Sequence, residues 1–131
     1  MASPTERVLV VDDEVEEREA LCELLSTWGF EAEAAEDGKH ALEMVLTFKP
    51  GVVVLDLGLP DATGAEVVRV IREDGKARII VFSGWHGLRD AALAAGADAF
   101  VLKPDLEALE RALLTPTPQP EVARKKRQGR P

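Results

Sequence analysis

The sequence lacks the features that mark secreted and membrane proteins. It has one cysteine, Cys22, which cannot form an intramolecular disulfide, and its start, Met-Ala-Ser-Pro-Thr-Glu-Arg, has no apolar signal region. No apolar run approaches the ~20 residues that a membrane-spanning helix needs. These absences predict a protein of the reducing cytoplasm.

The sequence has enough hydrophobic residues to form one core. Its charge is unevenly distributed along the chain. Its 131 residues are 46% hydrophobic, which fits a single domain. The net charge is −8, although residues 115–131 carry five basic side chains against one acidic side chain, Glu121. Residues 1–114 therefore have a net charge of −12. A folded domain with this much negative charge is not expected to bind nucleic acid.

Two apolar runs end in aspartates. The run Val8–Val11 precedes Asp12-Asp13, and the run Val52–Leu55 precedes Asp56. Continuous Val and Leu is typical of parallel strands buried on both faces, and ligands of such sheets bind outside the carboxyl ends of the strands. We expect the three carboxylates to converge on one crevice. Hard oxygen ligands of this kind suit Mg²⁺, which is the predicted cofactor.

Strand-like runs alternate with helical patterns over residues 7–114. The expected strands are 7–12, 31–35, 52–56, 79–83 and 99–102, and the expected helices are 14–28, 38–48, 64–73, 88–95 and 106–114. Right-handed crossovers put the helices on both faces of such a sheet. The pattern predicts one α/β domain with a doubly wound, five-stranded parallel sheet, preceded by a short extension, residues 1–6.

The strand ends carry an ordered set of groups. In chain order the set is Asp12-Asp13, Asp56, Leu59-Pro60, Gly64, Ser83-Gly84 and Lys103-Pro104. A single member of the set is weak evidence, but the ordered set resembles the receiver domain of two-component response regulators. The resemblance covers about Arg7 to Leu114 and implies a flavodoxin-like fold and a phosphorylation-dependent signalling switch.

The resemblance also implies roles for the acidic residues. Asp56 matches the residue that accepts a phosphoryl group from a phosphohistidine, on a sensor histidine kinase or a phosphotransfer protein. Asp13 and Asp56 match direct Mg²⁺ ligands, with the main-chain carbonyl of Gly58 as a third, and Asp12 is expected to act through water. A carboxylate is also a chemically suitable nucleophile for forming an aspartyl phosphate.

The other matching residues are expected to contact the phosphoryl group or to change position when it is present. Lys103 would reach the phosphoryl oxygens, and Ser83 would donate a hydrogen bond to one of them. Phe100, three residues before Lys103, matches the switch aromatic of the family, and Pro104 is expected to follow a cis peptide bond. The face Leu88–Leu114 would change on phosphorylation and contact a downstream protein.

Two positions depart from the usual pattern of the family. Gly58, two residues after the acceptor, has no side chain to orient or block an attacking water. Trp85, two residues after Ser83, is a large ring expected near the mouth of the site, where it should slow hydrolysis. His40 and His86 stand isolated, without metal-ligand spacing, and we interpret both as surface residues.

Taken singly, these residues have simpler interpretations. Asp12 and Asp13 could cap the first helix, because aspartate is a preferred N-cap residue. Lys103 alone would be a solvated surface lysine, Ser83 a turn residue and Phe100 a buried strand residue. Their positions at neighbouring strand ends favour the functional interpretation.

Two other function classes remain as alternatives. A phosphatase of the haloacid dehalogenase type also uses a nucleophilic aspartate after a strand, but it needs a second aspartate two residues later, where this chain has Gly58. A pseudo-receiver would act only as an interaction module and usually lacks the acceptor or the acidic pair. We therefore expect a phosphoacceptor domain rather than an enzyme acting on other substrates.

The last segment, residues 115–131, is expected to be disordered. Prolines at 116, 118 and 120 favour an extended spacer, and the basic block 124–127 has no apolar partner. It is either a solvated tail or linker, or an electrostatic contact with an anionic partner. The sequence leaves open whether the domain acts alone or within a longer regulator.

Overall fold

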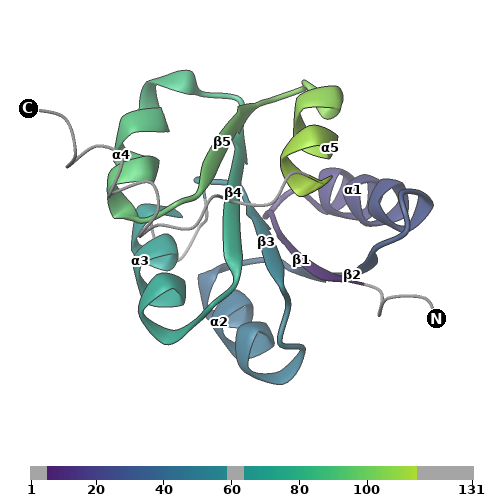
Figure 1. The fold of residues 1–131 in the computed structure, drawn as a ribbon, viewed down its shortest axis with the longest axis horizontal. Coiled ribbons are helices and arrows are strands. Elements are labelled where there is room, and N and C mark those ends of the chain that lie inside the picture. The colour runs from purple at the N-terminus through teal and green to yellow at the C-terminus, as the bar shows by residue number, and fades with distance from the viewer. Residues whose placement is uncertain (1–5, 59–63, 115–131) are drawn as a thin grey trace, which may run out of the picture.

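The computed structural model describes residues 6–58 and 64–114, with the side chain of residue 74 left aside. Strands and helices alternate throughout (Figure 1). The strands are β1 (Arg7–Val11), β2 (Glu31–Ala35), β3 (Val52–Leu55), β4 (Arg78–Ser83) and β5 (Ala99–Leu102). The helices are α1 (Val15–Thr27), α2 (Gly38–Thr47), α3 (Gly64–Asp74), α4 (Arg89–Ala95) and α5 (Leu106–Leu114).

The five strands form one parallel sheet in the order β2-β1-β3-β4-β5. The strand order reverses direction between β1 and β3, because the chain first moves outward to β2 and then returns past β1. In open α/β sheets the crevice at such a point is where ligands bind. The predicted α/β class and doubly wound parallel sheet are confirmed.

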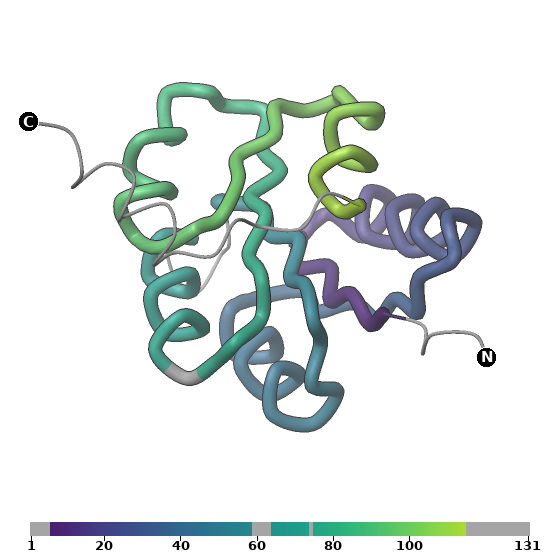
Figure 2. Tube along the Cα trace, in the orientation of Figure 1, coloured from purple at the N-terminus to yellow at the C-terminus, as the bar shows by residue number. Residues whose placement is uncertain are grey.

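Helices cover both faces of the sheet (Figure 1). Alternate strand residues, such as Val8 and Val10, pack with Leu25 of α1 and Leu109 of α5 on one face. Figure 2 shows these two helices side by side, although they are the first and last helices of the described residues. The other face packs against α2, α3 and α4. Burial on both faces explains why the strands are continuous apolar runs.

The helix ends lie within one residue of the predicted ends, although the first turn of the fourth helix differs. Gly29 follows the C-cap residue of α1, Trp28, and Gly96 is the C-cap of α4. Their φ values are 97° and 122°, a conformation that residues other than glycine rarely adopt. The predicted helix 88–95 begins instead with a short 3-10 turn, His86–Leu88, before α4. Among the described residues, no helix is long and apolar enough to cross a membrane.

Candidate functional site

The carboxyl ends of four strands bring the predicted side chains to one edge of the sheet. Asp12 follows β1, Asp56 follows β3, Ser83 ends β4 and Lys103 follows β5. Backbone hydrogen bonds continue the strand pairing past the strand ends, since Asp56 N donates to Val11 O at 2.9 Å and Lys103 N donates to Ser83 O at 2.8 Å. The residues that follow the strands are therefore held level with one another at the carboxyl-end edge of the sheet.

Three carboxylates form an acidic cluster. Oxygens of Asp12, Asp13 and Asp56 all lie within 4.8 Å of one another. Asp12 is buried, Asp56 is partly buried and Asp13 is exposed. Mg²⁺–oxygen bonds of ~2.1 Å put opposite ligands ~4.2 Å apart, so the spacing and the oxygen donors of the cluster are compatible with a magnesium ion.

Asp12 is held by its own hydrogen bonds. Its Oδ1 accepts from Glu14 N at 2.9 Å, and its Oδ2 accepts from Lys103 Nζ at 3.1 Å. The N-cap residue of α1 is Glu14, which makes no side-chain cap, so neither aspartate occupies the N-cap position. These two hydrogen bonds fix the position of the Asp12 carboxylate between the start of α1 and Lys103.

Lys103 connects the acidic cluster to α1. Its Nζ donates to Asp12 Oδ2 and to Glu17 Oε1, and it lies 3.6 Å from Asp56 Oδ2. Only 18% of its side chain is exposed. Lys103 is therefore not the solvated surface lysine that its sequence position alone would suggest.

Burial and charge shift the pKa values of Asp56 and Lys103. Burial raises the pKa of Asp56, with a further contribution from Asp12, and Lys103 opposes this rise. Burial alone would lower the pKa of Lys103, but the carboxylates of Glu17, Asp56 and Asp12 outweigh it and raise the pKa above its usual value. The lysine is therefore charged at neutral pH, with carboxylates around it.

Ser83 and Trp85 lie at the end of β4. Ser83 is 4% exposed, and its hydroxyl accepts from Trp85 N at 3.3 Å. Trp85 is 64% exposed. Gly84 between them is also exposed, and a β-carbon there would meet open space.

Phe100 and Pro104 flank the lysine in β5 and after it. Phe100 is partly buried and packs against the core on the α3 and α4 face. The Lys103–Pro104 peptide bond is cis, as the resemblance implied.

The segment after Asp56 contains two glycines, of which only Gly64 is required by the packing. The N–H groups of Leu57 and Gly58 donate to the Asp56 carboxylate, and a β-carbon at Gly58 would meet open space. A β-carbon at Gly64, by contrast, would lie 2.5 Å from Leu57 Cα, so glycine is required for α3 to start this close to the strand end. The Leu59-Pro60 pair of the sequence pattern lies outside the described residues.

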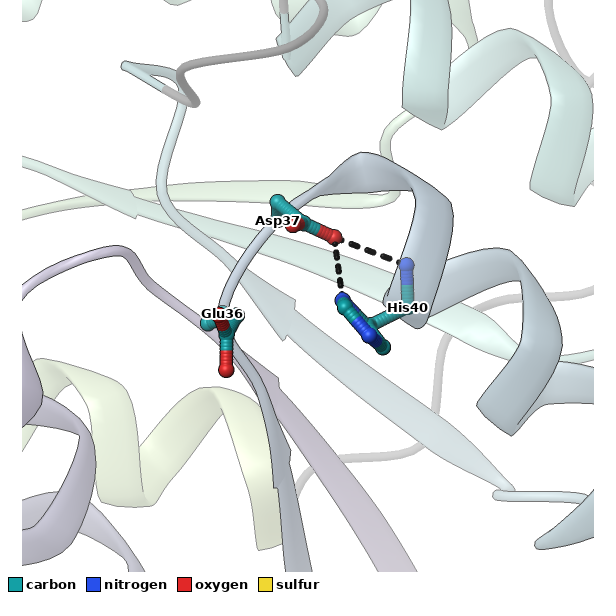
Figure 3. Close-up of side chains that lie close together, drawn as sticks. All are labelled: Glu36, Asp37 and His40. Carbon is teal, nitrogen blue, oxygen red and sulfur yellow. Dashed lines mark hydrogen bonds and ion pairs between the residues drawn. The ribbon is translucent and has the colours of Figure 1, made fainter.

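A second group of possible metal ligands lies where β2 leads into α2. Glu36, Asp37 and His40 offer ligand atoms within 4.8 Å of one another. Asp37 Oδ1 accepts hydrogen bonds from His40 N and from the His40 ring, each at 2.8 Å; the two contacts are drawn in Figure 3. The backbone hydrogen bond from His40 lowers the pKa of Asp37, and the side-chain hydrogen bond raises that of His40. Asp37 is the N-cap of α2, so helix capping accounts for the contact with His40 N, and the ring contact is an ion pair between residues three positions apart.

The description of the histidines as isolated is therefore wrong for His40, although its surface position is confirmed, with 52% of the side chain exposed. His86 is also exposed. The sequence interpretation missed Glu17 altogether. Its hydrogen bond to Lys103 joins positions 86 residues apart, and no local spacing indicates it.

Three comparisons with known proteins agree with this geometry. The family model of the response regulator receiver domain matches residues 8–114. Response regulator MprA of Mycolicibacterium vanbaalenii is 41% identical over 118 residues, which are 85% of this chain and 51% of that protein. MprA of Mycobacterium ulcerans is 42% identical over 118 residues, with the same coverage.

Solved structures show the same fold. Response regulator TrrA of Thermotoga maritima, in complex with Mg²⁺-BeF, has a TM-score of 0.78 and 34% identity, covering 83% of this chain and 96% of that chain. Chemotaxis response regulator CheY4 of Vibrio cholerae has a TM-score of 0.75 and 27% identity, covering 82% of this chain and 98% of that chain.

The fold and the acidic strand ends thus define a receiver-like α/β domain. The chain belongs to the response regulator receiver domain family of two-component signalling. Receiver domains are regulatory phosphoacceptors, so the chain belongs to a class of phosphorylation-dependent signalling switches. It spans about half the length of the curated relatives named above.

Proposed function

We propose that the chain accepts a phosphoryl group on Asp56 and thereby controls a protein partner. The observation that carries this proposal is the convergence of three carboxylates and Lys103 at one edge of the sheet. A carboxylate nucleophile beside a cation is what aspartyl phosphate formation needs, because phosphoryl transfer depends mostly on positioning and charge stabilisation.

In the proposed reaction, Asp56 attacks the phosphorus of a phosphohistidine on a sensor kinase or a phosphotransfer protein. A bond from the carboxylate oxygen to phosphorus forms, the phosphorus–nitrogen bond breaks, and its electrons return to the imidazole, which takes up a proton. Lys103, 3.6 Å from Asp56 Oδ2, would then contact the transferred phosphoryl oxygens.

We assign the magnesium site to Asp13, Asp56 and the carbonyl of Gly58, with Asp12 acting through water. Bound Mg²⁺ would neutralise part of the charge on the phosphoryl oxygens. The cluster dimensions support the assignment, as does the Mg²⁺-BeF complex of TrrA, which shares 34% identity with this chain. With no side chain at Gly58, water reaches Asp56 more easily, whereas Trp85 would slow that access.

The proposed output runs through Ser83 and Phe100 to the face Leu88–Leu114. Ser83 would exchange its present bond with Trp85 N for a bond to the phosphoryl group. The movement would leave space that Phe100 can fill, shifting a two-state equilibrium. We propose a downstream protein as the target and the reducing cytoplasm as the location, which the single cysteine suits.

Mg²⁺-dependent labelling with acetyl phosphate or phosphoramidate tests the proposed function. We expect a stable aspartyl phosphate at a stoichiometry of about one per chain, lost on chelation of Mg²⁺ and absent in Asp56→Asn. Turnover of many phosphodonor molecules per chain would instead indicate a phosphatase. No labelling would indicate a domain that acts only by binding, and either result would overturn the proposal.

A further inference from the structure

Lys103 is shared unequally among its carboxylate partners. An ammonium group has three N–H donors. Two of them are used by Asp12 and Glu17, while Asp56 Oδ2, at 3.6 Å, is beyond hydrogen-bonding distance. Lys103 therefore hydrogen-bonds to Asp12 and to Glu17 of α1, but not to Asp56.

A second contact holds the lysine on the same side. The Nζ atom lies 5.7 Å from the centroid of the Phe82 ring, within the range of a cation–π interaction. Phe82 belongs to the core on the α1 and α5 face. Glu17, Lys103 and Phe82 also line one apolar pocket of about 380 Å³ at this point, so the lysine stem has apolar surface to pack on.

We propose that Glu17 is a positioning residue that holds Lys103 on the α1 side and competes with the phosphoryl group for it. The inference rests on the proposed phosphorylation of Asp56. Lys103 Nζ has one N–H donor left for the phosphoryl oxygens, but bringing it closer to Asp56 than the present 3.6 Å would draw it away from Glu17 and lengthen that bond. Glu17 therefore slows phosphoryl uptake by making the productive position of Lys103 less populated.

The size of the effect follows from exposure. The Glu17 side chain is 48% exposed, so water screens its pairing with Lys103 considerably. Ion pairs in such positions change an equilibrium about two- to five-fold. Glu17→Gln, which keeps the shape of the side chain and removes its charge, should therefore raise the rate constant for phosphorylation about two- to five-fold at saturating Mg²⁺.

Glu16→Gln is the matched control. Glu16 is exposed on the same turn of α1, and among the described residues the ion pairs of Lys103 are with Asp12, Glu17 and Asp56. The control removes the same charge without touching the lysine, and its rate should equal that of the wild type. An equal gain in both variants would mean that general charge, and not the contact, limits the rate, which would overturn the proposal.

A double-mutant cycle with Lys103→Ala shows whether Glu17 acts through the lysine. Rates are measured with acetyl phosphate and with phosphoramidate, which differ in net charge. We expect Glu17→Gln to give the same gain with both donors and to give none in the Lys103→Ala background. A gain with acetyl phosphate alone, or a gain that persists without Lys103, would show repulsion of the donor and overturn the proposal.

The outcomes also separate this inference from the proposed function. A wild-type chain that takes up no label would refute both. Labelled wild type with an unchanged or lower rate in Glu17→Gln would refute the role of Glu17 alone.

Discussion

The charge balance at Asp56 predicts that Asp56→Asn stabilises the folded protein. Asparagine has nearly the same shape, and the change removes one of three carboxylates whose oxygens lie within 4.8 Å of one another. It also removes the pairing with Lys103, 3.6 Å from Asp56 Oδ2. Two repulsions are thus relieved and one attraction is lost.

The expected gain can be worked out from these distances. A pair of unit charges about 4 Å apart is worth ~1 kcal/mol in water and ~4 kcal/mol at an effective dielectric constant of ~20. The net change is about one repulsive pair, and Asp13 is exposed to water, so we expect about 1 to 2 kcal/mol. For a domain of this size, ~1 kcal/mol raises the melting temperature by about 3 to 5 °C.

The pH dependence of this gain has a definite sign. Burial raises the pKa of Asp56 in the folded state, so its contribution to stability is present below the ordinary value of 3.8 and is lost as the pH rises through the folded-state pKa. The advantage of Asp56→Asn should therefore be largest at neutral pH and shrink toward pH ~4.

The assay is thermal and urea unfolding of both proteins with Mg²⁺ chelated, at neutral and acidic pH. Asp90→Asn is the control, because the Asp90 side chain is 99% exposed and should change stability by no more than about 0.5 kcal/mol. Equal or lower stability of Asp56→Asn at neutral pH, or a gain independent of pH, would refute the electrostatic reasoning.

Three further substitutions test other parts of the site. Asp13→Ala should lose most of the rise in melting temperature that Mg²⁺ gives the wild type, because a ligand that binds only the folded state stabilises it by mass action; an unchanged rise would place the metal elsewhere. Ser83→Ala should still be phosphorylated but lose the phosphorylation-induced changes in amide NMR signals over residues 88–102, and the scheme fails if those changes persist. Gly64→Ala should lower the free energy of unfolding in urea by about 1 to 3 kcal/mol, because its β-carbon would meet the Leu57 backbone; unchanged stability would show that α3 can shift at no cost.

The sequence was informative where a single local rule determines the structure. Val8–Val11 and Val52–Leu55 are buried on both faces, so their continuous apolar runs identified parallel strands and placed the aspartates that follow them at one edge. The strand ends could be predicted because parallel pairing brings them together whatever the lengths of the connecting helices.

The contacts that were missed join side chains with no fixed relation in the sequence. Glu17 reaches Lys103 only because α1 starts close to the end of β5, and that distance depends on how the helix packs. Asp98 likewise accepts from Arg72 of α3 and, at 2.8 Å, from Ile79 N of β4, which ties α3 to the segment before β5. Packing of helices on the sheet decides such pairs, and a periodic pattern predicts that a helix packs but not its exact position along the sheet.

The register of β4 and β5 supports the proposed path from Ser83 to Phe100. Val81 pairs with Phe100 and Ser83 pairs with Leu102, so Phe100 lies beside the residue two positions before Ser83. Side chains alternate between the faces of a sheet. Since Val81 and Phe100 pack on the α3 and α4 face, the Ser83 side chain projects toward that same face. A displacement of Ser83 toward Asp56 would therefore change the packing of Phe100 and α4 before that of α1 or α5. For this reason the amide signals over residues 88–102 are the ones to follow.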